Sequence, residues 1–184
     1  MIDKIHLILL GTLLIWCSNC TSGVNKVLHS RDELLFKSDS LISAYPNDTD
    51  LVLAIIEAKI GYAKNKRGIT IYKEILQLDP NNPIAQYHIL MDEGFVYHSK
   101  GYKNGQWDAI QSFSKAATYI DTIGEPYYWI GQAYEKKDEM DFELPLESYN
   151  KSLELYLTDS MREKVVLSKE KLLKRKRTYE DFWK

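Results

Sequence analysis

The sequence has few of the residues and motifs that carry chemistry. Its 184 residues include two cysteines, of which the second is Cys20, and four histidines. It contains no HExxH, no GxSxG and no glycine-rich phosphate loop, which are patterns of zinc proteases, serine hydrolases and nucleotide-binding enzymes. No thiol nucleophile remains after Cys20. We therefore predict that the protein is not an enzyme, has no catalytic residues and needs no cofactor.

The sequence also gives no sign of a metal site. His88 and His98 are ten residues apart on one predicted helix, which places them on the same face but about 15 Å apart along its axis. That separation is too large for one ion. The acidic stretch 138–143, DEMDFE, lacks the spacing and the glycine of an EF-hand calcium loop. We interpret these residues as ordinary surface or hydrogen-bonded side chains and predict no metal.

Charge of one sign does not dominate the chain. The 24 basic and 26 acidic residues leave a net charge of -2, which gives no global attraction to nucleic acid. Residues 162–177 are locally basic, with eight Lys or Arg and two Glu. This stretch is interpreted either as the polar face of a terminal helix or as a contact with anionic lipid or an acidic partner. We predict no nucleic-acid partner.

The longest apolar run is short. Residues 5–16, IHLILLGTLLIW, form a run of twelve, whereas a membrane-spanning helix needs roughly 20. The run matches the apolar core of a secretory signal peptide, and the polar stretch CSNCTSGVN follows it. The CxxC spacing also allows a redox or zinc pair or a local disulfide, and the apolar run allows ordinary secretion or an uncleaved anchor.

The segment around the cysteines resembles the lipobox of bacterial lipoprotein signals, in which a peptidase cuts before an acylated cysteine. The resemblance implies lipidation of Cys20 or Cys17. We favour Cys20, because Asn19 is smaller than Trp16, although a lipobox usually has Gly, Ala or Ser there. Residues 1–19 are then a signal peptide and 20–29 a tether. The implied location is the bacterial cell envelope, lipid-anchored to a membrane and facing the periplasm or the surface.

The rest of the chain predicts helices. Thirteen Tyr, against nine Gly and five Pro, supply large side chains suited to packed helices. Apolar residues recur three and four apart, Ser30 begins a capping box, and prolines follow the apolar runs. The expected helices cover 30–45, 50–62, 68–78, 83–98, 107–120, 126–134, 145–157 and 159–177. We expect Tyr179, Phe182 and Trp183 either to pack back on the last helix or to form a docking peptide.

These helices recur with a period of about 34 residues. Pro46 and Pro80 are 34 apart and end successive helical segments. Two stretches read Tyr127-x2-Ile130-Gly131-x2-Tyr134 and Ala109-x3-Phe113-x2-Ala116. They resemble the tetratricopeptide repeat (TPR) family, whose pattern is W-x2-L-G-x2-Y on the first helix and A-x3-F on the second. Tyr72, Pro80 and Tyr149 occupy further positions of the same pattern.

The TPR resemblance implies an all-α fold, a solenoid of antiparallel helix pairs over 30–158. A capping helix and tail over 159–184 would cover its end. The unit near Pro83 matches less well: Tyr87, Leu90 and Met91 fit it loosely, and a long turn is expected at 99–106. With its Gly-containing turn and KAA ending, this unit resembles the Sel1-like variant of the repeat.

The resemblance further implies a non-catalytic protein-interaction scaffold. Stacked helix pairs form a concave groove from their first helices, and such grooves bind peptides or helices of partner proteins. The groove residues that we predict are Lys59, Gln86, Glu93, Tyr128 and Gln132. The alternative hypothesis is an immunity-type or inhibitor lipoprotein that blocks a toxin or hydrolase. The sequence does not identify the partner.

Overall fold

The computed structural model describes residues 29–183 except residues 67 and 102, and the statements below concern these residues. They form helices, and no β-strand occurs among them. The helices are α2 (Arg31–Phe36), α3 (Ser38–Ala44), α4 (Thr49–Lys66), α5 (Ile69–Leu78), α6 (Pro83–Ser99), α7 (Lys103–Tyr119), α8 (Glu125–Lys137), α9 (Glu143–Glu154) and α10 (Asp159–Phe182).

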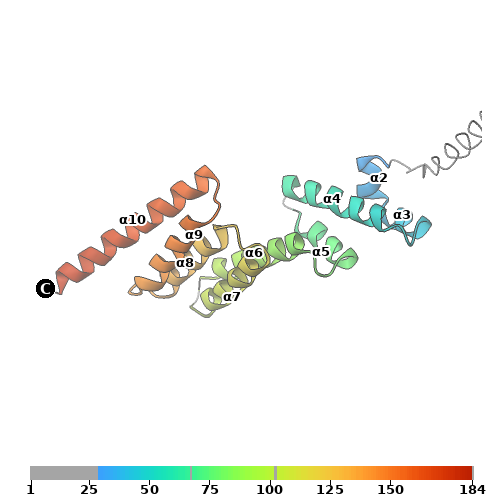
Figure 1. Ribbon diagram of the computed structural model, residues 1–184. Coiled ribbons are helices and arrows are strands. Elements are labelled where there is room, and N and C mark those ends of the chain that lie inside the picture. Colours follow the sequence, from blue (N-terminus) through green and yellow to red (C-terminus); the bar gives the residue numbers. More distant parts are fainter. Residues whose placement is uncertain (1–28, 67, 102, 184) are drawn as a thin grey trace, which may run out of the picture.

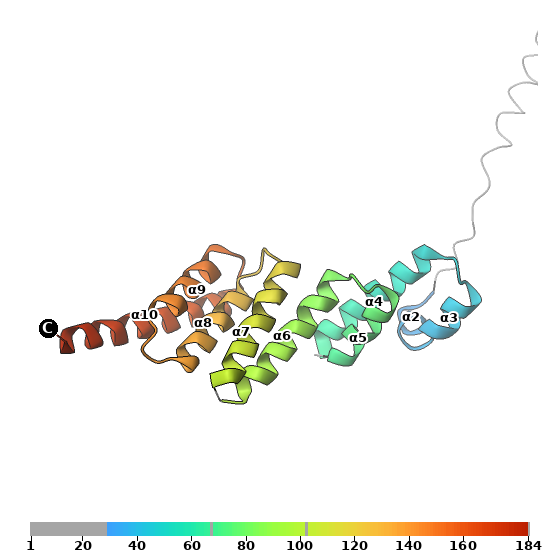
Figure 2. The same ribbon diagram turned by 90° about the horizontal axis from the view of Figure 1, so that it is seen from below.

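Successive helices pack as pairs in an elongated solenoid (Figures 1 and 2). The pairs are α4 with α5, α6 with α7, and α8 with α9, and each pair also contacts the next one. The chain reverses direction at every short linker, so the two helices of a pair are antiparallel. This arrangement confirms the predicted all-α, TPR-like solenoid. None of the described helices has a stretch long and apolar enough to cross a membrane.

Local sequence signals explain where several helices begin. Ser30 and Glu33 form the predicted capping box, in which each side chain accepts a hydrogen bond from the other residue's backbone N–H. Asn82 caps α6 and accepts a hydrogen bond from the Ala85 N–H at 3.1 Å, with Pro83 in the first turn. Thr158 caps α10 in the same way.

The predicted single helix over 30–45 is wrong, because it is interrupted at Lys37. Lys37 leaves helical geometry, with φ -121° and ψ 19°, and separates α2 from α3. The following residues, Ser38, Asp39 and Ser40, are weak helix formers because their side chains compete for backbone hydrogen bonds. The break yields two short helices, both of which contact α4.

The predicted long turn at 99–106 is also wrong. Helix α6 continues to Ser99 and α7 begins at Lys103, four residues before the expected start. Gln106 is fully buried and joins the two helices: its amide donates to the His98 carbonyl at 3.2 Å, and its amide oxygen lies 2.7 Å from the His98 Nδ1. The extra residues of this unit are therefore mostly helical rather than part of a loop.

Two glycines allow close approach within the later pairs. A Cβ on Gly131 would lie 2.6 Å from the ring of Tyr149. A Cβ on Gly94 would lie less than 3.0 Å from three ring atoms of Phe113. Gly94 therefore occupies in α6 the place of Gly131 in α8, and Leu90-x2-Glu93-Gly94-x2-Tyr97 is the matching stretch. The looser alignment through Tyr87 and Met91 is corrected by this contact.

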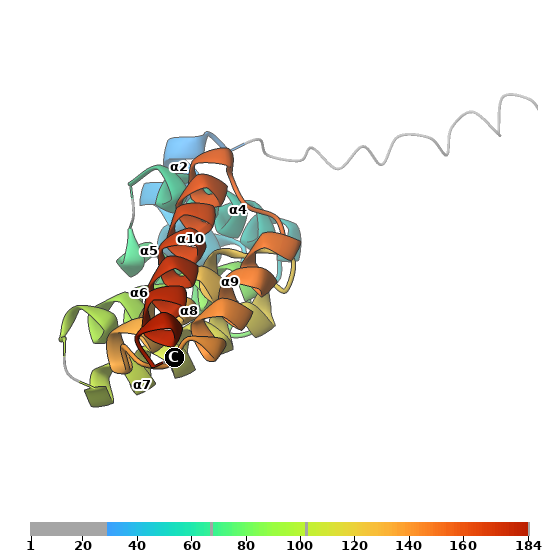
Figure 3. The same cartoon turned by 90° about the vertical axis from the view of Figure 1, so that its left-hand side faces the viewer.

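Helix α10 covers the end of the solenoid beside α9 (Figure 3). Val165 and Leu172 are buried against Tyr128, Phe142 and Tyr149. The chain after 177 packs back only in part, because the Tyr179 ring contacts the Phe142 ring with centroids 5.7 Å apart. It continues as helix to Phe182, whose side chain is 78% exposed.

A polar chain also ties α10 to the last pair. The Tyr149 hydroxyl accepts a hydrogen bond from the Gln132 amide and donates one to a Glu135 carboxylate oxygen. The other Glu135 oxygen pairs with Arg175 at 3.0 Å. Burial, followed by the hydrogen bond to Glu135, raises the pKa of Tyr149, so the hydroxyl stays protonated and able to donate.

Candidate partner-binding groove

A groove of about 380 Å³ lies where the first helices of successive pairs converge. It is lined from α4 by Lys64, from α6 by Ile84, Tyr87 and His88, from α8 by Glu125 and from α10 by Met161. Linker residues complete it, namely Ile120, Ile123, Tyr156, Leu157 and Thr158. We refer to this set as the first-helix groove.

The linkers that line the first-helix groove are fixed to each other. The Gly124 N–H donates to the Tyr156 carbonyl and the Tyr156 N–H donates to the Thr122 carbonyl, both at 2.9 Å. The buried Ser152 hydroxyl donates to the Gly124 carbonyl at 2.7 Å. A Cβ on Gly124 would collide with the Ser152 carbonyl oxygen, so the two linkers approach this closely only with glycine at residue 124. The groove therefore has a preformed wall.

The groove is apolar with a few polar groups at its edge. The His88 ring stacks on Tyr72 with centroids 4.4 Å apart. Burial, followed by the charge of Lys64, lowers the pKa of His88, so the ring is neutral at pH 7. Burial, followed by the charge of Glu125, raises the pKa of Tyr87, which also remains neutral. The fixed charges at the groove are therefore one cation, Lys64, and one anion, Glu125.

Such a lining suits a binding site. A small number of placed polar groups around an apolar floor is typical of ligand and peptide sites. The groove residues include no hydroxyl or thiol nucleophile paired with a base. Within the described ranges, no three His, Cys, Asp or Glu side chains are grouped to hold a metal ion. His98 bonds to Gln106 and His88 stacks on Tyr72, so the two rings do not act together.

The sequence-predicted groove residues lie in different environments. Lys59 is 6% exposed, and its Nζ pairs with Glu74 at 2.6 Å. Tyr128 is 8% exposed beneath α10, and Gln132 is engaged by Tyr149. Gln86 donates to the Pro80 carbonyl at 3.0 Å, and Glu93 is exposed on α6. None of the five lines the first-helix groove.

The groove residues that sequence reasoning missed include several isoleucines. Ile84, Ile120 and Ile123 lie at helix ends or in linkers. Apolar residues there do not belong to a helical repeat pattern, so the sequence does not indicate which surface they form. His88 was noticed only as a rejected metal ligand. The convergence of loops 120–124 and 155–158, residues far apart in sequence, left no local signal.

The predicted repeat-signature residues differ in burial. Tyr72, Ala109, Phe113, Ala116, Ile130, Gly131 and Tyr149 are buried, Tyr127 and Tyr134 are half-buried, and Pro80 is exposed in the turn between α5 and α6. The lipidation candidates Cys17 and Cys20 lie outside the described residues.

The fold defines a helical-repeat protein of TPR-like architecture. No protein-family model matches the chain, and no curated protein does. A crystal structure of MamA is similar to it, with 16% sequence identity, a TM-score of 0.37, and coverage of 78% of this chain and 86% of that one. A likeness of this size carries no argument about function, and the fold assignment rests on the helix pairing itself.

Proposed function

We propose that this protein is a non-catalytic scaffold of the bacterial cell envelope that binds a segment of a partner protein in the first-helix groove. One observation carries the proposal: side chains from α4, α6, α8 and α10 converge on a single preformed, mainly apolar groove. Repeat proteins use surfaces of this kind, formed by successive units, to hold extended ligands. The inhibitor alternative is a special case in which the bound partner is an enzyme.

Site-specific photocrosslinking in a bacterial host tests the groove. A photoreactive amino acid replaces Ile84 or Met161 in the groove, or Lys73, which is exposed on α5 outside it. We expect one discrete crosslinked partner from both groove positions and none from Lys73. Equal crosslinking from all three positions would contradict the assignment of the groove.

A disruptive variant separates binding from mere proximity. Ile84→Glu places a charge on the apolar wall and is expected to weaken the complex about tenfold, as loss of a central interface residue does. Lys73→Glu is the control for a charge change on the surface. If the captured partner is an enzyme whose activity is lost in a stoichiometric complex, the inhibitor role is favoured.

We further propose that the anchor is a lipid on Cys20 or Cys17. The twelve-residue apolar run and the cysteines directly after it support this proposal. Intact-mass measurement of the membrane fraction tests it. A mature chain that begins at one of these cysteines and carries added lipid mass is expected, and an unprocessed chain without lipid would refute the anchor.

A further inference from the structure

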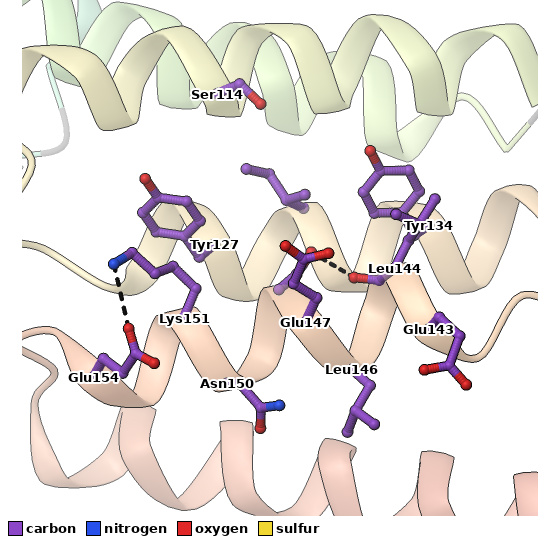
Figure 4. Close-up of a pocket in the computed structure, with 12 residues that line it drawn as sticks. Ser114, Tyr127, Tyr134, Glu143, Leu144, Leu146, Glu147, Asn150, Lys151 and Glu154 are labelled. Atoms are coloured by element: carbon purple, nitrogen blue, oxygen red, sulfur yellow. Dashed lines mark hydrogen bonds and ion pairs between the residues drawn. The ribbon is translucent and has the colours of Figure 1, made fainter.

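A second groove, of about 590 Å³, lies between α7 and α9 with α8 as its floor (Figure 4). Tyr127, Ile130 and Tyr134 of α8 form the floor, and Ser114 of α7 forms one wall. Helix α9 supplies the other wall, namely Glu143, Leu144, Leu146, Glu147, Ser148, Asn150, Lys151 and Glu154. We call it the second-helix groove. Each residue of an α-helix is rotated by about 100° from the one before it. Tyr127, Ile130 and Tyr134 therefore share one face of α8, and Glu125 and Tyr128 lie on the opposite face.

An aromatic corner adjoins the second-helix groove at Tyr134, which belongs to both. The rings of Trp107 and Tyr134 meet almost at right angles, with centroids 6.2 Å apart and planes at 80°. The Lys137 ammonium lies 3.8 Å from the Trp107 centroid and 5.3 Å from that of Tyr134. Two perpendicular rings around one ammonium are the arrangement that recognises cations through their π-faces. The corner is therefore able to hold a cation, and Lys137 shows where that cation sits.

Carboxylates reinforce this preference for positive charge. Burial raises the pKa of Tyr134, and the nearby charges of Asp141 and Glu147 raise it further. Figure 4 shows Glu147 pointing across the groove toward α8, between Tyr127 and Tyr134. Glu154 and Glu143 are each engaged by a lysine, at Lys151 and Lys176. Glu147 is thus the groove carboxylate best placed to meet a cation from outside.

Lys137 itself is held loosely. It is the last residue of α8, where a cation is favoured by the helix dipole whether or not a ring is nearby. No ion pair joins it to a carboxylate within the described residues. Trp107 is 46% exposed, so the corner opens to solvent. A second cation can therefore replace Lys137 without breaking a salt bridge.

We propose that the second-helix groove binds a basic, partly apolar peptide segment of a partner protein, one of whose Lys or Arg side chains replaces Lys137 between Trp107 and Tyr134. Glu147 pairs with a further basic residue, and apolar side chains lie against Tyr127 and Ile130 of the floor and Leu144 of the α9 wall. Charge complementarity selects this occupant over an acidic or neutral one. The site goes beyond the first-helix groove and does not depend on it.

A peptide selection tests this proposal on the full chain. Random twelve-residue peptides are selected on the wild type and on Trp107→Leu, Glu147→Lys and Tyr119→Leu variants. Tyr119 is the matched control, because it is an exposed aromatic residue at the other end of α7. We expect Lys- and Arg-rich peptides with apolar neighbours from the wild type and the control, and loss of that preference in the other two variants.

Affinities of the selected peptide make the test quantitative. Trp107→Leu is expected to weaken it about tenfold, in the range of a partly desolvated cation–π contact. Trp107→Phe, which keeps a ring, is expected to lose less. Neutral or acidic selected peptides, no selected peptides, or equal binding by Trp107→Leu would each overturn the proposal.

The position of Lys137 gives a second readout that does not depend on the variants. Its Nζ lies over the Trp107 ring, so the adjacent ε-methylene protons are expected to resonate upfield in the free protein. Binding of the peptide should move them to the ordinary lysine position. Unchanged Lys137 signals in the complex would refute displacement. Binding of the same peptide to Ile84→Glu should be unaffected, which distinguishes this site from the first-helix groove.

Discussion

The N-terminal pair and the two later pairs use different contacts for the same architecture. In α6–α7 and α8–α9 a glycine, Gly94 or Gly131, lies directly under an aromatic ring of the second helix. In α4–α5 the corresponding residue is Ile56, which packs with Tyr72 in an aliphatic cluster. A glycine lets the ring approach the helix backbone, whereas an isoleucine fills that space with its own side chain.

A second position differs in the same way. Three residues after the glycine, the later pairs have Tyr97 and Tyr134, and the first pair has Lys59. The buried Lys59 ammonium pairs with Glu74. The three helix pairs therefore share one geometry but are stabilised by different contacts. In the two later pairs an aromatic ring packs on a glycine, and in α4–α5 an aliphatic cluster and an ion pair take its place.

The largest expected effect follows from placing a methyl group in the glycine contact. Gly94→Ala forces its Cβ into the Phe113 ring and should lower the free energy of unfolding by about 2–3 kcal/mol, as overpacking does. Denaturant unfolding of the full chain measures it. The control is Gly61→Ala in α4, whose Cβ would meet only Arg31 at 3.4 Å. It should be neutral or stabilising by up to about 1 kcal/mol. Equal losses in both would contradict the comparison.

The polar chain in the last pair gives the next effect. Tyr149→Phe keeps the ring over Gly131 but removes the hydroxyl between Gln132 and Glu135. The free energy of unfolding should fall by about 1–2 kcal/mol, because two hydrogen bonds disappear and the half-buried Glu135 carboxylate loses a donor. Thermal unfolding and amide exchange in α10 measure it. Unchanged exchange in α10 would show that this chain does not hold the cap.

In α4–α5, removing the Glu74 charge alone is expected to lower the free energy of unfolding more than replacing both members of the Lys59–Glu74 ion pair. Glu74→Gln leaves Lys59 charged and buried and should cost about 1 kcal/mol. Lys59→Met with Glu74→Gln replaces the pair by an apolar side chain of similar length and should recover that loss. A double variant less stable than Glu74→Gln alone would indicate that the ion pair itself stabilises the helix pair.

The smallest effect is a pH dependence that arises from α6. Burial, followed by nearby lysines, lowers the pKa of His88 and His98, although the Gln106 hydrogen bond partly opposes this at His98. The unfolded chain therefore binds more protons below about pH 6.5, and stability is complete above that pH and is lost as the pH falls. His88→Phe keeps a ring against Tyr72 and should reduce the slope between about pH 7 and 5. An unchanged slope would assign the dependence elsewhere.

The helices could be read from the sequence where the signal was local. Ser30 with Glu33, the prolines that follow the apolar runs, and the three- and four-residue spacing of apolar side chains each act within one or two turns. The TPR spacing identified Gly131 and Phe113 because their patterns were complete. Gly94 was missed because Glu93 occupies the usual leucine position, so only its contact with Phe113 reveals the register.

The candidate sites were harder to predict from the sequence than the helices, because they depend on contacts between segments far apart in the chain. Lys59 and Tyr128 were expected at a binding surface, but Glu74 engages the first and α10 covers the second. The first-helix groove needs the 120–124 and 155–158 linkers side by side. The Trp107–Tyr134 corner needs α7 against α8. Neither arrangement follows from spacing along the chain.

Hydrogen exchange of the full chain in complex with its crosslinked partner tests the central claim most directly. If the first-helix groove is the binding site, backbone amides in 84–88, 120–125 and 156–161 should exchange more slowly in the complex than in the free protein. Amides of α5 around Lys73, which lies outside both grooves, should be unchanged. Protection confined to other segments, with the groove exchanging as in the free chain, would contradict the account.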